Sequence, residues 1–215
     1  SFIFNEKHIN SGYYQRMKAE KNEQILDAAL EEFLTKGVAA ASMQRIAQEA
    51  QVSKRTLYKY YSSKEELFGE LLDVILCEME SIYQFDLSKF NSQDDVVEVI
   101  SNFLDQKMAI TFNESFLRIN RMAIGEILRG TQIPKEQMDR INKSEMLFLE
   151  WIKGAQKKGV IRGDLEATQI AGDFNSLLKG QIYWPVLLGM VEASEIKKAQ
   201  VKGHILDIFS EYYLT

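Results

Sequence analysis

Residues 42–67 read SMQRIAQEAQVSKRTLYKYYSSKEEL, and this stretch predicts two short helices joined by a tight turn and followed by a longer helix. Ser42 and Ser53 are good N-cap residues, because each hydroxyl can accept a hydrogen bond from a free N–H group of the first helical turn. Ser63 and Glu66 have the spacing of a capping box for the third helix. Two helices joined in this way form the unit that places its second helix in the major groove of DNA.

The charge of this stretch also indicates a nucleic-acid partner. From Ser42 to Lys64 it contains a single acid, Glu49, whereas the whole chain has a net charge of −5. A solvated helix face normally mixes both signs, and tyrosine hydroxyls between the basic residues can donate to phosphates. The basic residues are Arg45, Lys54, Arg55, Lys59 and Lys64, and the tyrosines are Tyr58, Tyr60 and Tyr61.

The pattern continues on both sides of this stretch. It comprises ILDAA at residues 25–29, Phe33, Gly37, SM at 42–43, IA at 46–47, VSKRTLYKYY at 52–61 and SKEEL at 63–67. In order and spacing, these residues resemble the DNA-binding domain of the TetR family of transcriptional repressors, over about Glu20 to Leu72.

Two residues depart from the family pattern. Gln51 stands where glycine is usual at the turn, and a positive φ costs energy in a non-glycine residue. Tyr61 stands where phenylalanine is usual, and its hydroxyl needs water or a partner. Both departures concern the stability of the turn rather than the fold.

The resemblance implies which residues contact DNA. Residues 53–60 would form the recognition helix, with Arg55 as the best candidate for a bidentate contact to guanine. The N-terminus of the preceding helix would hold a phosphate through its backbone N–H groups. The serines are also helix caps, so a structural role competes with DNA contact there. The expected contacts are Ser42, Gln44, Ser53, Lys54, Arg55, Thr56, Tyr58, Lys59, Tyr60 and Lys64.

The whole chain predicts an all-α fold, because Pro occurs only 2 times and Gly 12 times in 215 residues and no strand alternation is present. We expect a three-helix helix-turn-helix head and a larger helical ligand-binding and dimerisation domain, about nine helices. The expected domains are an N-terminal extension at 1–18, the DNA-binding domain at 19–65 and the ligand-binding and dimerisation domain at 66–215. Helices are expected at 20–35, 43–50, 54–61, 64–83, after a Ser92 cap, at 116–128, 135–158, 164–188 with a kink near Pro185, and 194–213.

The N-terminal extension contains Lys7, His8 and Arg16. These residues could contact the DNA backbone as an arm, but the segment could also be an upstream remnant without a role.

Composition argues against several other classes of protein. Cys77 is the only cysteine, so no internal disulfide can form, as is typical of a reducing cytoplasm. No apolar run approaches the roughly 18 residues of a membrane span, and no secretion signal is recognisable. With 2 histidines and no phosphate loop or nucleophile motif, we expect no metal, no cofactor and no enzymatic activity.

The C-terminal half carries the expected dimer and ligand sites. The resemblance implies a homodimer formed by the last two helices and a pocket for a small hydrophobic effector among the middle helices. Large apolar residues at helical spacing are usually core, and this interpretation stays open for every one of them. The pocket candidates are Phe103, Phe112, Phe116, Asn120, Phe148, Trp151, Phe174 and Tyr183. The dimer candidates are Ile170, Phe174, Leu177, Leu178, Gln181, Ile205, Leu206 and Phe209.

We therefore expect a ligand-responsive, sequence-specific transcriptional regulator, in particular a repressor released from a palindromic operator in double-stranded DNA by a small hydrophobic effector. The alternative is a DNA-binding protein without an effector. A helical enzyme is the third class, and it lacks a recognisable motif.

Overall fold

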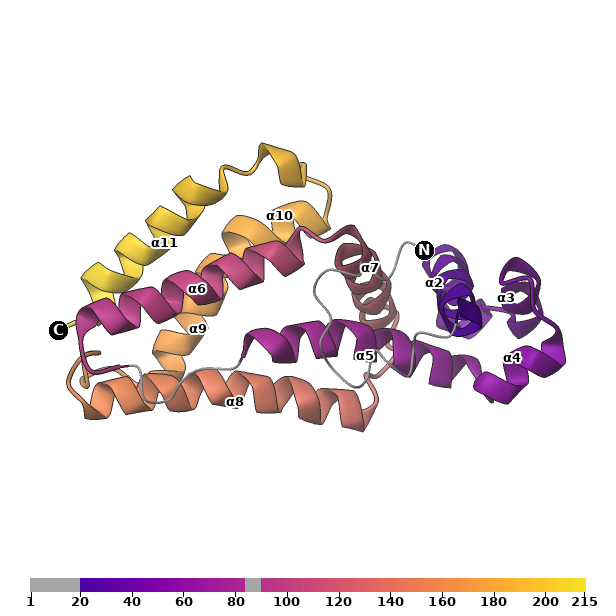
Figure 1. Cartoon of the computed structure of the whole chain (residues 1–215), viewed down its shortest axis with the longest axis horizontal. Helices are drawn as coiled ribbons and strands as arrows, with labels where there is room; N and C mark the ends of the chain where they lie inside the picture. The colour runs from indigo at the N-terminus through magenta and orange to yellow at the C-terminus, as the bar shows by residue number, and fades with distance from the viewer. Residues whose placement is uncertain (1–19, 84–89) are drawn as a thin grey trace. The chain divides into compact units, whose positions relative to one another are not determined.

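The structure, a computed structural model, describes residues 20–83 and 90–215. The expected N-terminal arm with Lys7, His8 and Arg16 lies outside these residues. The described residues form helices joined by short connections, and no β-strand occurs among them, which confirms the all-α fold (Figure 1).

The chain forms two compact units. Unit 1 comprises the described residues up to Cys77 together with 114–138, and unit 2 comprises 78–113 and 139–215. These bounds differ from the sequence-based boundary at 65/66, because residues 66–77 and 114–138 group with the head. The division falls within two continuous helices, α5 (Lys64–Ile82) and α8 (Lys135–Lys157).

Unit 1 contains α2 (Glu20–Ala40), α3 (Met43–Glu49), α4 (Lys54–Tyr60), most of α5 and α7 (Glu114–Leu128). The apolar residues at helical spacing form its core, in which burial of each large side chain stabilises the unit by roughly 1.5–3 kcal/mol. The most buried of them are Ile25, Leu26, Leu30, Phe33, Ile46, Leu57, Leu67 and Leu71.

Helix α2 does not stop at Gly37 but changes direction there. Gly37 has φ 75° and ψ 160°, which is outside the helical region, and helical structure resumes as far as Ala40. The sequence predicts an end to the first helix at this glycine, so the local geometry is as expected although the helix is longer.

The structure agrees with the predictions for the two serine caps and for the two residues that depart from the family pattern. Ser42 and Ser53 are the N-caps of α3 and α4. Gln51 has φ 54°, the left-handed conformation expected at the turn. The Tyr61 hydroxyl donates a 2.8 Å hydrogen bond to Oδ1 of buried Asn22, which supplies the partner that this hydroxyl needs.

Unit 2 contains the last turn of α5, α6 (Gln93–Thr111), most of α8, and α9 (Ala167–Leu178). The chain continues through the π-helical turn η1 (Lys179–Tyr183), α10 (Trp184–Leu187), the 3₁₀ turn η2 (Ala193–Glu195) and α11 (Lys198–Tyr213). Helix α11 packs against α6 and α9 (Figure 1). The turn η1 also packs against α6. Ser92 is the N-cap of α6, as predicted.

Two helix starts in unit 2 differ from the prediction, and the expected kink takes the form of a π-helical turn. Helix α9 begins at Ala167 rather than after Asp164, because the Asp164 carboxylate instead accepts a 2.7 Å hydrogen bond from Arg162 Nε. The expected kink is the π-helical turn η1, which ends two residues before Pro185 and accommodates a residue without an N–H donor. Helix α11 begins at Lys198 instead of Ser194. Among the residues that the structure describes, no helix has the length and apolarity to cross a membrane.

Candidate nucleic-acid interface

Helix α4 presents a basic and aromatic surface to solvent. Lys54, Arg55 and Lys59 are exposed, and the Tyr58 and Tyr60 side chains are 52% and 39% exposed. Leu57 is fully buried on the opposite face and attaches the helix to the core of unit 1. Leu57 therefore anchors a helix whose basic and tyrosine side chains face solvent.

Ser53 and Thr56 are engaged with each other at the start of this helix. The Ser53 Oγ atom accepts a 3.0 Å hydrogen bond from the Thr56 backbone N–H, and the two hydroxyls are 2.8 Å apart. The two residues define the first turn of α4 and leave Arg55 exposed between them.

The start of α3 is connected to α2 by Glu32. The Ser42 backbone N–H donates to Glu32 Oε1 at 3.3 Å, and Arg45 Nε lies 3.5 Å from Glu32 Oε2. Gln44 is exposed beside them. The Arg45 side chain remains 67% exposed despite this ion pair, so its charge contributes to the basic surface, although Arg45 is not among the DNA contacts expected from the sequence.

The Lys64 side chain, expected to contact a phosphate, is hydrogen-bonded to the backbone of the protein itself. Its Nζ atom donates hydrogen bonds to the backbone carbonyl of Ala39 and, at 3.5 Å, to that of Ala41. The side chain is half-buried, and its charge stabilises carbonyl groups at the end of α2. An ammonium group has three protons, so a phosphate contact by Lys64 is compatible with this position.

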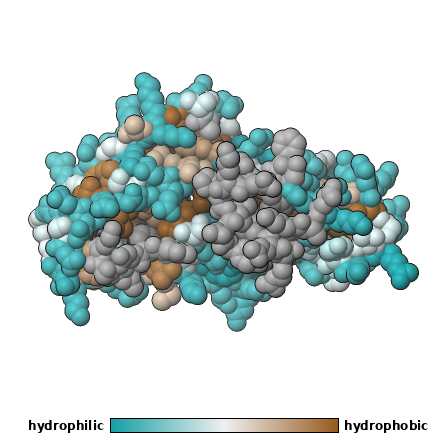
Figure 2. Space-filling model, in the orientation of Figure 1, coloured by the Kyte–Doolittle hydropathy of each residue, from teal (hydrophilic) through white to brown (hydrophobic). Residues whose placement is uncertain are grey.

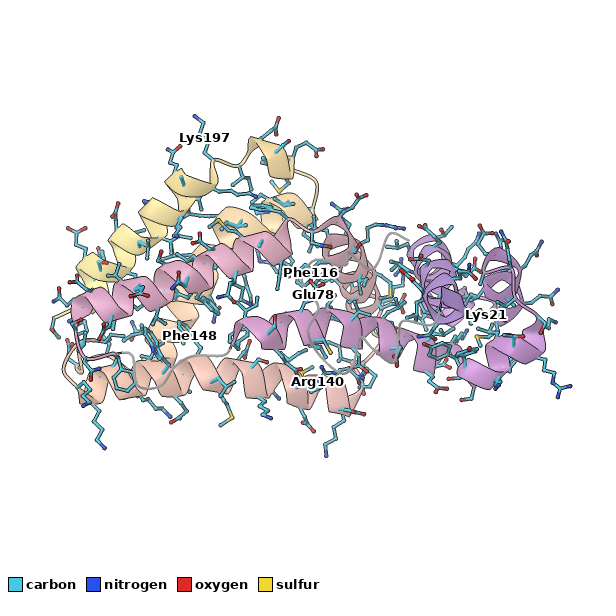
Figure 3. The ribbon with its side chains drawn as sticks, in the orientation of Figure 1. Lys21, Glu78, Phe116, Arg140, Phe148 and Lys197 are labelled. Carbon is cyan, nitrogen blue, oxygen red and sulfur yellow. The ribbon has the colours of Figure 1, made fainter. Side chains whose placement is uncertain are left out.

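The pocket candidates fall into separate groups. Phe103, Phe148 and Phe174 are buried together in unit 2, with ring centroids 5.2–5.9 Å apart, and Trp151 stacks on Phe148 at 6.1 Å. Phe148 projects from α8 into the interior of this unit (Figure 3). These four residues form a contiguous aromatic cluster.

The other pocket candidates lie outside this cluster. Phe112 is half-buried under the Lys198 ammonium group, 4.6 Å from its ring centroid. Tyr183 belongs to η1 and contacts Trp184 edge to face. Phe116 and Asn120 lie on α7 in unit 1, where the Asn120 side chain donates to the Phe116 carbonyl.

Most of the dimer candidates are buried within the single chain. The buried ones are Ile170, Phe174, Leu178, Ile205 and Phe209, all of which belong to the core of unit 2. Leu177, Gln181 and Leu206 are half-buried and remain accessible. Sequence periodicity could not separate the two sets, because half-buried Leu177 and Leu206 directly adjoin the buried residues Leu178 and Ile205.

Other apolar residues near the C-terminus are more exposed than these candidates. Trp184 is 40% exposed, Leu188 63%, Met190 73% and Tyr212 64%. Hydrophobic residues also interrupt the hydrophilic surface in the space-filling view (Figure 2). Exposed apolar side chains are typical of protein interfaces where they form a contiguous patch.

Two models of families of transcriptional regulators match separate parts of this sequence. Residues 25–71 match the family model for bacterial regulatory proteins of the tetR family. Residues 98–215, more than half of the chain, match the model for the C-terminal domain of AefR-like transcriptional repressors.

Individual relatives agree with these matches. The chain is 38% identical over 155 residues to the uncharacterized HTH-type transcriptional regulator YhgD of Bacillus subtilis (strain 168), covering 70% of this chain and 74% of YhgD. A TetR family transcriptional regulator from Pseudomonas syringae pv. tomato has a TM-score of 0.67 at 28% identity, covering 92% and 98% of the two chains. The flavonoid-responsive regulator FrrA has a TM-score of 0.61 at 27% identity, covering 90% and 97%.

Proposed function

Since the chain belongs to the TetR family of transcriptional regulators, we propose that it represses transcription as a homodimer on a palindromic operator, from which a small effector releases it. The exposed surface of α4 supports this proposal best. Its N-terminal residues Lys54 and Arg55 are unobstructed, and a helix with such residues fits the major groove, where a guanidinium reads guanine through two hydrogen bonds.

The contacts divide into two kinds. Arg55, with Lys54 and Thr56, would meet base edges and supply specificity. Tyr58, Lys59 and Tyr60 would meet phosphates or flanking bases, and Ser42, Gln44 and Lys64 would hold phosphates from the ends of neighbouring helices. Phosphate contacts provide salt-dependent affinity, because each one releases condensed counterions.

Dimerisation would strengthen the binding of this small head to DNA. One seven-residue recognition helix contacts few base pairs, whereas a two-fold dimer doubles the interface and reads a palindrome. The exposed apolar residues Trp184, Leu188, Met190 and Tyr212, with half-buried Leu177, Gln181 and Leu206, support a dimer surface on the C-terminal helices.

The effector site belongs to unit 2 in this proposal. Its interior is rich in aromatic residues, and the relative FrrA is described as flavonoid-responsive, which supports a small, largely apolar effector. Helix α5 begins at Lys64 in the head and ends in unit 2. An effector that binds the released state better than the DNA-bound state would shift the equilibrium through this continuous helix.

The test begins with selection of bound sequences from randomised duplex DNA, followed by titration of the enriched operator. We expect a palindromic sequence and one dimer per operator. Arg55→Ala should weaken binding by about 1–3 kcal/mol and relax preference at one base pair of each half-site. Lys153→Ala, at an exposed lysine on α8, is the control. Absence of any enriched sequence, or equal losses for Arg55→Ala on all sequences, would contradict the proposal.

A further inference from the structure

The side chain of Lys107 on α6 ends beside aromatic rings of unit 2. Its Nζ atom lies 4.4 Å from the centroid of the Tyr83 ring and 5.5 Å from that of Phe103. Both aromatic residues are buried. Within residues 20–83 and 90–215, the amine has cation–π contacts but no ion pair or hydrogen bond with another group.

The electrostatic surroundings of this amine are unfavourable to its charge. Burial lowers the pKa of Lys107 to about 7, and the positive charge of Lys179 contributes in the same direction. Glu145 acts in the opposite direction, but its side chain is exposed and forms no ion pair with Lys107 in the described part of the chain. An anion placed beside the amine would favour the charged form and so would be bound strongly.

A second observation concerns the element that packs against α6 at this end of unit 2. The π-helical turn η1 contacts α6 and carries Lys179 and the half-buried Gln181. Such turns are rare and often occur at functional sites, because the wider turn leaves backbone groups and side chains in unusual positions. Two lysines from different elements therefore contribute positive charge to one region.

The side chains that surround the amine within unit 2 are apolar and buried. Phe103 lies one helical turn before Lys107 and stacks on Phe148 of α8. The Lys107 residue is only half-buried, so its surroundings are not closed to solvent. An amphipathic molecule could therefore place an acid group at the amine and an apolar group against these rings.

We propose that the effector of unit 2 is a small amphipathic carboxylate, bound through an ion pair with Lys107 and through apolar contact with Tyr83 and Phe103. This inference rests on the proposed function, since it names the chemical class of the effector. The positive charge of Lys179 would favour the same anion. An uncharged molecule of the same shape would gain the apolar contact but not the ion pair.

The test compares carboxylates with their uncharged primary amides. The probes are the n-alkanoates from octanoate to tetradecanoate and 2-naphthoate, each with its matched amide, titrated calorimetrically into the full-length protein without DNA. The variants are Lys107→Met, which removes the charge at similar volume, and Lys107→Arg, which keeps it. Lys153→Met is the control, because Lys153 is an exposed lysine of the same unit.

We expect at least one carboxylate to bind the unchanged protein about 10- to 100-fold more tightly than its amide. Lys107→Met should remove this preference without weakening the amide, whereas Lys107→Arg should retain part of it and Lys153→Met all of it. Should Lys107→Met fail to fold, as judged by circular dichroism, Lys107→Gln replaces it.

Two results would overturn the inference. In the first, no carboxylate binds more tightly than its amide. In the second, the tighter binding of the carboxylate persists when the charge of Lys107 is removed. If the amides bind as tightly as the acids, the effector is an uncharged apolar molecule, and the proposed function still holds. Operator binding does not enter this measurement, so a failure of DNA recognition cannot produce either result.

Discussion

Glu126 on α7 accepts a 3.1 Å hydrogen bond through Oε1 from the backbone N–H of Val38, beyond the kink in α2. The Glu126 side chain is almost fully buried, and it also accepts hydrogen bonds from Arg129 and Thr131 at 3.0 and 2.8 Å. A buried carboxylate with three donors is well satisfied. It joins α7 to the segment that leads into the helix-turn-helix.

Replacement of this carboxylate should destabilise unit 1. In Glu126→Gln the amide has one oxygen and one NH2 group, so it cannot accept from both Val38 and Thr131. We expect a loss of about 1–3 kcal/mol in the free energy of unfolding, measured by urea titration. Glu150→Gln, at an exposed ion pair with Lys153, should change it by less than about 0.5 kcal/mol. Similar effects of the two substitutions would show that the Glu126 hydrogen bonds contribute little.

The conformation of Gly37 gives a second prediction. A Cβ atom at this position would lie 2.9 Å from Glu126 Oε1, and φ is 75°. We expect Gly37→Ala to destabilise the protein by about 1–3 kcal/mol, because steric strain adds to an unfavourable φ. Gly69→Ala in α5 is a matched control in the same unit, since its Cβ would meet nothing closer than 3.7 Å. Gly69→Ala should leave the free energy of unfolding unchanged or raise it by up to about 1 kcal/mol. If Gly69→Ala lowers it as much as Gly37→Ala does, the prediction is wrong.

The Tyr61–Asn22 hydrogen bond predicts coupling between two residues of the head. Tyr61→Phe leaves the Asn22 Oδ1 atom buried without its donor, at a cost of about 1–3 kcal/mol in unfolding free energy. Asn22→Leu with Tyr61→Phe removes both polar groups and should cost less than the sum of the single substitutions. A double-mutant cycle by urea unfolding measures this coupling. Strict additivity would mean that the hydrogen bond contributes nothing.

Much of the head could be predicted from sequence because its signals are local. The hydroxyls of Ser42 and Ser53 cap helices three residues away at most, and the turn requires the positive φ found at Gln51. The wrong helix start after Asp164 has a different cause, since the Arg162 ion pair competes with capping. The surroundings of Lys107 depend on tertiary packing against Tyr83, which no local pattern reveals.

The ion pair between Glu80 and Arg140 predicts a dependence on pH. Arg140 donates two hydrogen bonds, of 2.8 and 2.9 Å, to the carboxylate, and they lower the pKa of Glu80 below its usual value of 4.5. The ionised form therefore stabilises the folded state above about pH 4.5, and this contribution is lost as pH falls through the lowered pKa.

We expect Glu80→Gln to reduce the unfolding free energy by up to about 1 kcal/mol at pH 7, because the pair is partly exposed. The difference from the unchanged protein should shrink when urea unfolding is repeated at successively lower pH below 4.5. Glu150→Gln again serves as the control. A difference that stays constant or grows on acidification would exclude this role for Glu80.

Lys64 should affect both DNA affinity and the stability of the head. Its ammonium group donates to the carbonyls of Ala39 and Ala41 and, in the proposed complex, also to a phosphate. Lys64→Ala should therefore weaken binding to all DNA sequences alike and reduce the slope of log affinity against log salt by about one unit for each phosphate that is no longer bound. It should also lower unfolding free energy, by about 0.5–1.5 kcal/mol, because the hydrogen bonds to the carbonyls are absent in this variant even without DNA.

The two effects can be separated by experiment. Lys64→Arg retains the charge and should preserve most of the salt dependence, while urea unfolding without DNA reports the carbonyl hydrogen bonds alone. Lys153→Ala controls for removal of a lysine elsewhere. A salt slope unchanged by Lys64→Ala, together with lowered stability, would mean that this lysine serves only the end of α2. The reverse result, an altered slope with unchanged stability, would show that the carbonyl hydrogen bonds do not stabilise the free head.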